Sequence, residues 1–276
     1  MEDDAPAPER AERAKEAGNV KYKAGQYDEA IRLYGEAVRL MPSTATYLIN
    51  RAAAYLMLQK AEEALSDCNA ALAHAPGLIK AHVRAAKSLT QLGRLSDARR
   101  QLELGATFGA DETLNAEMRA LTELENAMRS AKETLRQDGG APAREALRLY
   151  TLLVERCPCS PSIACQQMEA LLRARPEQGP SQVIAESARW LRKFGDNPDL
   201  LCVRGKGLYA GGQVEAALKH FTEALRLDPD HTSSRKMRQK IKEYERVKEA
   251  GKEAFQAGRY KAVSYTHLTL PTKRIV

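Results

Sequence analysis

Small residues recur along the chain with a period of 34 residues. One position of the period holds alanine in three successive segments, at Ala30, Ala64 and Ala98. A second position holds small residues at a constant phase, at Gly18, Ala52 and Ala86. A period of this length is typical of proteins that stack one supersecondary unit on the next. The pattern therefore predicts a solenoid, whose length grows by the addition of units.

Residues 11–44 show how one unit is built. Apolar residues at helical spacing run from Ala11 to Leu40, with an interruption at residues 23–26 and a stop at Pro42. This pattern predicts two antiparallel helices joined by a tight turn. Small residues mark where the two backbones approach closely, and tyrosines supply bulk between them. Because one such pair cannot bury both of its faces, we expect an all-α solenoid of antiparallel helix pairs.

The phase of the repeat also predicts the domain organisation. Ala98 and Ala146 are 48 residues apart instead of 34, so about 14 extra residues separate two modules. These residues have a helical pattern and lack the Gly, Ser and Pro of a flexible linker. The expected order is a disordered N-terminus (1–10), a three-repeat module (11–112), a helical spacer (113–126), three divergent repeats (127–231), a linking helix (232–243) and the start of a further repeat (244–262).

The last stretch, residues 263–276, does not continue the helical pattern. Its β-branched residues and Pro271 are unsuited to the second helix that the further repeat requires. We interpret this stretch as a non-native tail, a translated adaptor sequence that follows an incomplete coding sequence.

Composition narrows the class of protein. Hydrophobic residues make up 43% of the chain, charged residues 29% and aromatic residues 5%, which is typical of a soluble helical protein. No stretch approaches the 18 apolar residues of a membrane span, and the first residues are acidic, unlike a signal or transit peptide. We therefore expect no membrane partner and a cytoplasmic location, with the nucleus as a second location. Five cysteines, an odd number, fit free thiols in a reducing compartment.

The formal net charge of +7 raises the question of nucleic-acid binding. Lysine and arginine are spread over the helices and interleaved with acids, and no basic run with aromatic residues occurs. A basic groove that attracts acidic peptides accounts for the same sign of charge. We expect no nucleic-acid partner.

Catalytic chemistry has little support in the sequence. Cys157, Cys159 and Cys165 are close in sequence, but zinc needs a fourth ligand, and His220 and His231 are too distant along a solenoid. No phosphate-binding loop, carboxylate pair or nucleophile with a neighbouring base is visible. We expect no enzyme activity, no cofactor and no metal.

Five polar residues on the first helices of the first three repeats form the candidate site. Lys15 and Asn19 are four residues apart on one helix face, as are Lys80 and Arg84, and Asn50 belongs to the repeat between them. Lysine, arginine and asparagine side chains supply the donors that carboxylates bind. Basic residues on a helix are usually just solvated. Only six asparagines occur in the chain, however, and two of them fall at these positions together with three bases.

The order Gly18, Tyr27, Ala30, Tyr34 and Pro42 resembles the tetratricopeptide repeat family, which implies a tetratricopeptide-repeat superhelix. In that family the five polar residues match a two-carboxylate clamp. The resemblance implies that they grip the C-terminal Glu-Glu-Val-Asp tails of heat-shock protein 70 and heat-shock protein 90.

A second clamp is only partly represented. Lys248 matches its first basic residue, but Lys252 stands where the family pattern has Asn. In the divergent repeats Ala131 and Leu135 replace the required Lys and Asn, so we do not expect a clamp there.

The order of the modules resembles the N-terminal part of a family of J-domain co-chaperones. Local matches are residues 50–55, 203–205 and 228–231. The resemblance implies a fragment of an adaptor that holds both heat-shock proteins and passes client proteins between them. Two alternatives remain, a regulatory repeat module of an enzyme such as a phosphatase or prolyl isomerase, and a general interaction scaffold.

Overall fold

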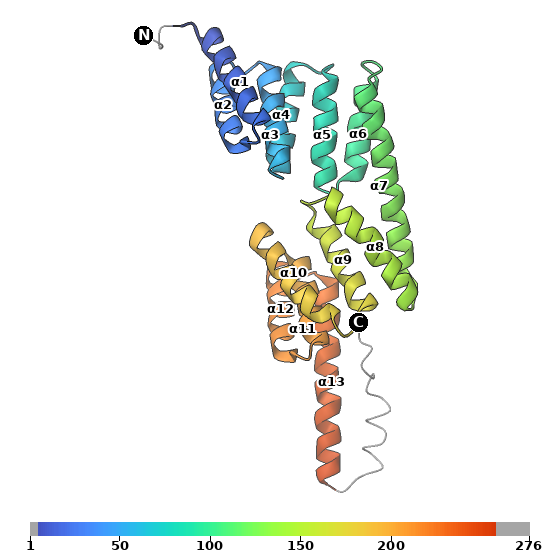
Figure 1. Cartoon of the computed structure of the whole chain (residues 1–276). Coiled ribbons are helices and arrows are strands. Elements are labelled where there is room, and N and C mark those ends of the chain that lie inside the picture. Colours follow the sequence, from blue (N-terminus) through green and yellow to red (C-terminus); the bar gives the residue numbers. More distant parts are fainter. Residues whose placement is uncertain (1–4, 258–276) are drawn as a thin grey trace. The chain divides into compact units, whose positions relative to one another are not determined.

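The computed structural model describes residues 5–257, which form thirteen helices and no strand (Figure 1). The helices are α1 (Ala7–Lys23), α2 (Tyr27–Leu40), α3 (Ala45–Met57), α4 (Ala61–His74), α5 (Ile79–Gln91), α6 (Leu95–Ala106), α7 (Glu112–Arg136), α8 (Gly140–Arg156), α9 (Pro161–Ala174), α10 (Gly179–Phe194), α11 (Pro198–Ala210), α12 (Val214–Leu227) and α13 (Thr232–Gln256). The predicted all-α fold is confirmed. The stretch interpreted as a non-native tail, 263–276, lies outside the described residues.

Each regular helix pair is joined by a tight turn that contains one residue with a left-handed backbone. The angle φ is 75° at Gly25, 55° at Gln59 and 75° at Gly93, three positions that are 34 residues apart. The same turn recurs between α11 and α12, where φ is 81° at Gly212. Glycine adopts this conformation readily because it has no Cβ, and it occupies three of these four positions. The recurrence of the left-handed residue fixes where each pair reverses direction. The period in the sequence is therefore the period of the backbone.

In three of the helix pairs a small residue of the first helix packs closely on a larger residue 16 positions later. A Cβ added to Gly18 would lie 2.7 Å from the Tyr34 ring, and one added to Gly205 would lie 2.7 Å from the Phe221 ring. In the second repeat Ala52 packs in one cluster with the smaller Cys68. The bulk of one partner is therefore matched to the size of the other, as close-packed interiors require.

The first helices of neighbouring repeats also touch one another. Helix α1 contacts α3, and α3 contacts α5, in addition to the contacts within each pair. Residues at one phase of these helices therefore come together on one surface, which is where the candidate site residues lie.

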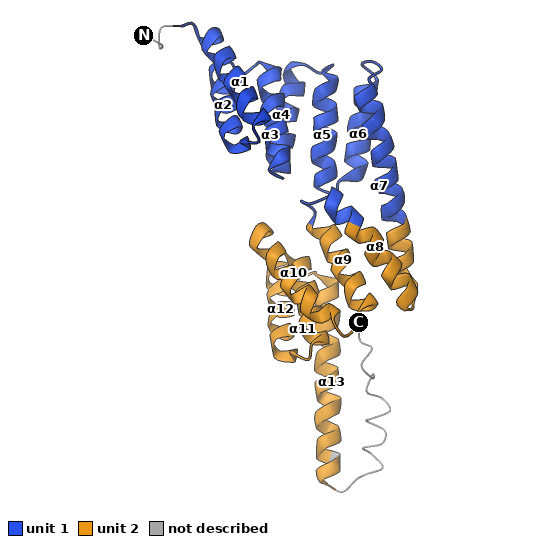
Figure 2. Ribbon diagram, viewed as in Figure 1, with its two compact units in different colours: residues 1–129, 152–160 blue, residues 130–151, 161–276 orange. Residues whose placement is uncertain are grey.

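The chain forms two compact units (Figure 2), of which unit 1 comprises residues 1–129 and 152–160, and unit 2 comprises 130–151 and 161–276. Within unit 1, the short segment 152–160 is joined to residues 1–129 by two hydrogen bonds of Cys159. Its backbone N–H donates to the Gln91 carbonyl at 2.9 Å, and its thiol donates to the Gln59 carbonyl at 3.1 Å. This segment therefore contacts the turns that end the first helices of repeats two and three.

Helix α7 packs on α6 within unit 1 and continues beyond the predicted spacer. Leu114 and Leu121 are buried, and the Arg99 guanidinium donates to the Glu125 carboxylate at 2.9 Å. The spacer (113–126) and the following residues form one helix because no Gly or Pro interrupts the sequence between them.

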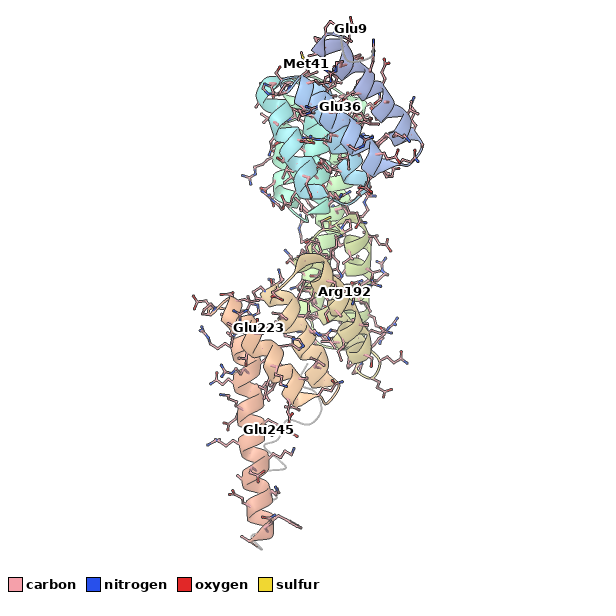
Figure 3. All side chains as sticks on the ribbon, turned by 90° about the vertical axis from the view of Figure 1, so that its left-hand side faces the viewer. Glu9, Glu36, Met41, Arg192, Glu223 and Glu245 are labelled. Atoms are coloured by element: carbon pink, nitrogen blue, oxygen red, sulfur yellow. The ribbon has the colours of Figure 1, made fainter. Side chains whose placement is uncertain are left out.

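In unit 2, α13 packs on the α11–α12 pair, and its Ile241 shares a core cluster with Phe221. The predicted linking helix continues without a break into the start of the further repeat, since α13 extends from Thr232 to Gln256. Charged side chains such as Glu245 extend from its surface (Figure 3). Within the described residues, none of the helices combines the length and apolar character needed to cross a membrane.

The N-terminus differs from the expectation of disorder over residues 1–10. Helix α1 begins at Ala7, so residues 7–10 are helical. Pro8 stands in the first turn, where its missing N–H costs no hydrogen bond, and Glu9 adds an acidic side chain that suits a helix N-terminus. Pro6 at the N-cap and Pro8 in the first turn are therefore both part of a helix start.

We expect Gly18→Ala to lower the free energy of unfolding by about 1–3 kcal/mol, because the new methyl group would overlap the buried Tyr34 ring. Gly35→Ala is the matched control in the same repeat, since its Cβ would meet only Arg51 Nη1 at 3.6 Å. Alanine there should be neutral or stabilising by up to about 1 kcal/mol. Urea denaturation followed by circular dichroism measures both. Equal effects of the two substitutions would contradict this account of the helix contact.

Candidate functional site

The fold brings Asn19 of α1 and Asn50 of α3 into contact. Tyr34 Oη donates to Asn19 Oδ1 at 2.7 Å, and Asn50 Nδ2 lies 3.5 Å from the same oxygen. Because the Asn19 carbonyl oxygen accepts both contacts, its amide nitrogen is left to donate elsewhere. Both asparagines are half-buried. The arrangement therefore offers amide donors at the junction of the first two repeats.

Arg84 of α5 reaches the same region from the third repeat. Its Nη1 donates to the carbonyl of Ile49, the residue before Asn50, at 2.9 Å. Burial lowers the pKa of Arg84 from its ordinary value, and the neighbouring Cys68, Tyr22 and Tyr34 act in the opposite direction. A guanidinium carries five N–H donors and keeps its charge in proteins, so this single bond leaves donors available.

The two lysines of the predicted set lie one helical turn before Asn19 and Arg84. Lys15 is ion-paired with Glu12, and its side chain is 19% exposed. Tyr47 Oη of α3 donates to the other oxygen of the Glu12 carboxylate at 3.1 Å. Lys80 is exposed. The structure thus joins Asn19, Asn50 and Arg84 through shared neighbours and places a lysine at either side.

Sequence reasoning missed the residues that support this set. Tyr34 was predicted only as bulk between helices, and Glu12 and Tyr47 were not predicted at all. The three-residue spacing of Glu12 and Lys15 was a usable signal, because such pairs face each other on a helix. Tyr47 gave no comparable signal, since its contact with Glu12 joins residues 35 positions apart.

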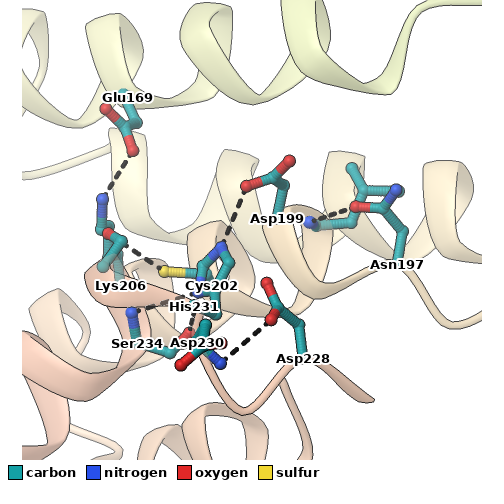
Figure 4. A network of polar contacts seen from close by, with 11 residues as sticks. Glu169, Asn197, Asp199, Cys202, Lys206, Asp228, Asp230, His231 and Ser234 are labelled. Atoms are coloured by element: carbon teal, nitrogen blue, oxygen red, sulfur yellow. Dashed lines mark hydrogen bonds and ion pairs between the residues drawn. The ribbon is translucent and has the colours of Figure 1, made fainter. Parts of the chain in front are cut away.

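Unit 2 uses the corresponding positions differently. Ala131 and Leu135, which stand where a clamp would have Lys and Asn, are buried in the core. On the first helices of the next two repeats, Lys206 of α11 donates to the Glu169 carboxylate of α9 at 2.5 Å (Figure 4). The two side chains are 17% and 28% exposed. This lysine is therefore neutralised within the unit.

A histidine ties the start of α13 to α11 in the same region (Figure 4). His231 Nδ1 accepts the backbone N–H of Ser234 at 3.2 Å, and Nε2 lies 3.0 Å from Asp199 Oδ1. Since Nδ1 accepts, the neutral ring carries its proton on Nε2 and donates it to the carboxylate. His231 thus caps a helix and has a structural role.

The remaining candidates for chemistry are structural as well. All five cysteines are free thiols and buried, and burial raises the pKa of Cys157 to about 12. Within the described part of the chain, no group of three or more His, Cys, Asp or Glu side chains is arranged to hold a metal ion. Lys248, the candidate for a second clamp, is exposed on α13.

Comparison with known proteins places the fold of the chain in a class. A family model described as TPR repeat matches residues 18–59, and one described as tetratricopeptide repeat matches residues 198–231. The crystal structure of the P58(IPK) TPR domain covers 95% of this chain and 75% of its own, with a TM-score of 0.61 and 20% identity. The chain is a tetratricopeptide-repeat protein.

Within this class the chain is homologous to the DnaJ homolog subfamily C member 7 proteins. The human protein is 30% identical over 262 residues, which are 94% of this chain and 51% of that protein. The predicted resemblance to J-domain co-chaperones is thereby confirmed. The chain spans about half the length of the curated relatives it matches. The first TPR domain of Spaghetti (RPAP3), solved with the heat-shock protein 90 peptide SRMEEVD, is 32% identical and covers 42% of this chain and 93% of its own, with a TM-score of 0.41.

The contact between Lys206 and Glu169 predicts a specific effect on stability. Glu169→Gln removes the charge that balances a largely buried ammonium group, so we expect a loss of about 1–3 kcal/mol in the free energy of unfolding. Glu169→Gln combined with Lys206→Met should recover most of that loss. Thermal melting measures both.

Glu223→Gln is the control, because Glu223 pairs with Arg226 at the exposed surface of α12. It should leave the melting temperature unchanged. If Glu169→Gln behaves like this control, the pair contributes nothing to unit 2.

Proposed function

We propose that the clamp, defined as Lys15, Asn19, Asn50, Lys80 and Arg84, binds the C-terminal Glu-Glu-Val-Asp tails of heat-shock protein 70 and heat-shock protein 90. The observation that carries the proposal is that Asn50 contacts Asn19 while Arg84 donates to the carbonyl of Ile49, the residue before Asn50, so that three successive first helices are linked at one place. A ligand held there contacts all three repeats at once. On this proposal the chain is a non-catalytic adaptor.

The chemistry of the clamp suits the end of an acidic peptide. A C-terminal Asp presents two carboxylates, one from the main chain and one from the side chain, and each needs several donors. Arg84 and the two lysines supply charged donors, which bind carboxylates more strongly than neutral ones do. The free amide nitrogen of Asn19 supplies a neutral donor for a carboxylate or a peptide carbonyl.

Homology supports the cellular role. The alignment with DnaJ homolog subfamily C member 7 covers 94% of this chain, including both units. An adaptor that brings two chaperones together and passes client proteins between them is the role we propose for the whole protein. Unit 2 lacks the clamp set and pairs Lys206 internally, so we assign chaperone-tail binding to unit 1.

The first test is calorimetry with the peptide Glu-Glu-Val-Asp and the whole chain. We expect micromolar binding, about −7 to −8 kcal/mol. Arg84→Glu reverses a charge in the site, and Lys80→Glu does so at an exposed position where folding is not at risk. Each should weaken binding by at least about 1–3 kcal/mol. Amidation of the peptide removes one carboxylate and should weaken it similarly.

Arg100→Glu is the matched control for charge. Arg100 lies on α6, the second helix of repeat three, and its side chain is 76% exposed. It makes the same change in net charge away from the clamp, so affinity should change less than twofold, by about 0.4 kcal/mol at most. The clamp would be refuted if amidation of the peptide left the affinity unchanged. It would also be refuted if Arg100→Glu weakened binding as much as Arg84→Glu or Lys80→Glu.

A second test concerns the orientation of Asn19. Tyr34→Phe keeps the ring that packs on Gly18 but removes the hydroxyl that holds Asn19 Oδ1. The amide can then rotate, and we expect binding to weaken by about 0.5–1.5 kcal/mol, less than in Asn19→Ala. Unchanged affinity in Tyr34→Phe, alongside a clear loss in Asn19→Ala, would show that the hydroxyl does not orient the amide.

A further inference from the structure

Glu12 places a carboxylate of the chain itself on a basic residue of the clamp. Its Oε1 is paired with Lys15 Nζ, and its Oε2 accepts from Tyr47 Oη at 3.1 Å. Lys15 and Glu12 lie on α1 and Tyr47 on α3, the same two helices that carry Asn19 and Asn50. The carboxylate is therefore fixed at the edge of the clamp by donors from two repeats.

The charge of Glu12 matters at neutral pH. The hydrogen bond from Lys15 lowers the pKa of Glu12 below its ordinary value, with a further contribution from Tyr47. The carboxylate is therefore ionised under ordinary conditions. The three bases Lys15, Lys80 and Arg84 carry +3 in total, and Glu12 reduces this to +2. An incoming carboxylate meets a like charge beside one of its donors.

Two other acids lie near clamp lysines, Glu16 near Lys15 and Asp111 near Lys80, and among the described residues neither forms an ion pair with that lysine as Glu12 does. Asp111 lies close to Lys80, but its Oδ1 accepts the backbone N–H of Leu114 at 3.0 Å and so caps α7. Its role is explained by the helix start. Glu12 lies in the middle of α1 and accepts no backbone N–H as a cap, so its contacts are with side chains of the groove.

We propose that Glu12 is an intramolecular competitor, which occupies a donor that the ligand's carboxylate needs and thereby limits the affinity of the clamp. This inference rests on the function proposed above. Glu12 is 49% exposed, so solvent screens its pair with Lys15, and a ligand can displace it. When the ligand leaves, the Lys15 ammonium group regains Glu12 as its partner, so the free site is stabilised relative to the bound one.

The test is calorimetry of Glu12→Gln with the Glu-Glu-Val-Asp peptide. The amide keeps the shape of the side chain and removes the charge. We expect binding to tighten by about two- to fivefold, the range that corresponds to the strength of exposed ion pairs. The affinity should also fall more steeply with added salt, because the net charge of the site rises by one.

Two comparisons isolate the contact with Lys15. In a Lys15→Ala background the gain from Glu12→Gln should shrink towards none, since the competition is for that ammonium group. Glu36→Gln, which removes the same charge from α2, should change affinity less than twofold (Figure 3). Circular dichroism checks that each variant is folded, and Glu12→Ala serves as a second variant should Glu12→Gln be unstable.

The outcomes separate this inference from the function on which it rests. If the unaltered chain does not bind the peptide, or binds the amidated peptide equally well, the proposed function fails. If the chain binds as proposed but Glu12→Gln binds equally or more weakly, then Glu12 positions Lys15 or is inert, and the competitor is refuted. A gain that persists in the Lys15→Ala background would also refute it, because it would reflect general charge.

Discussion

The packing of a small residue against a larger one within the helix pairs α1–α2, α3–α4 and α11–α12 is the contact on which the rest of the structure depends. Gly18 and Tyr34, Ala52 and Cys68, and Gly205 and Phe221 are all 16 residues apart and all buried. The sizes vary in opposite directions, with glycine opposite an aromatic ring and alanine opposite a smaller side chain. A constant separation along the chain repeats the same pairing geometry, and repetition brings equivalent positions of successive first helices to one surface. The arrangement of the proposed clamp residues is a consequence of that repetition.

The parts of the fold and site that depend on phase were predictable from the sequence. The 34-residue period predicted the helix pairs, and in the structure Asn50 of α3 contacts Asn19 of α1 while Arg84 of α5 donates to the neighbouring Ile49 carbonyl. Such predictions succeed because a residue's position within a repeat determines its face, and the stacking of repeats determines its neighbours. No knowledge of individual side-chain contacts is needed for this step.

The parts that depend on particular side chains or on distant segments were not predictable. Cys159 donates hydrogen bonds to the carbonyls of Gln59 and Gln91, which joins residues as far as 100 positions apart. The 34-residue repeat carries no signal for such a contact. The continuity of α7 and α13 was missed because a phase marks where a repeat begins but does not require the helix to stop there. The role of Glu12 depends on its contact with Tyr47, 35 positions away, which the spacing of Glu12 and Lys15 on one helix does not reveal.

The two units show why the fold alone does not determine binding. Both stack helix pairs, and both place lysine on first helices. In unit 2 the ammonium group of Lys206 is paired with Glu169 of another repeat, and both side chains are largely buried. The charge of this lysine therefore stabilises the packing of the repeats and is not available to a ligand. In unit 1 the only acid that pairs with a clamp base among the described residues is Glu12, half exposed and on the same helix as its partner. The more deeply buried pair holds repeats together, whereas on our proposal the more exposed pair of Glu12 yields to a competing carboxylate. On the function proposed here, the difference between a structural surface and a binding surface in this solenoid lies in how deeply each basic residue's own acid is buried.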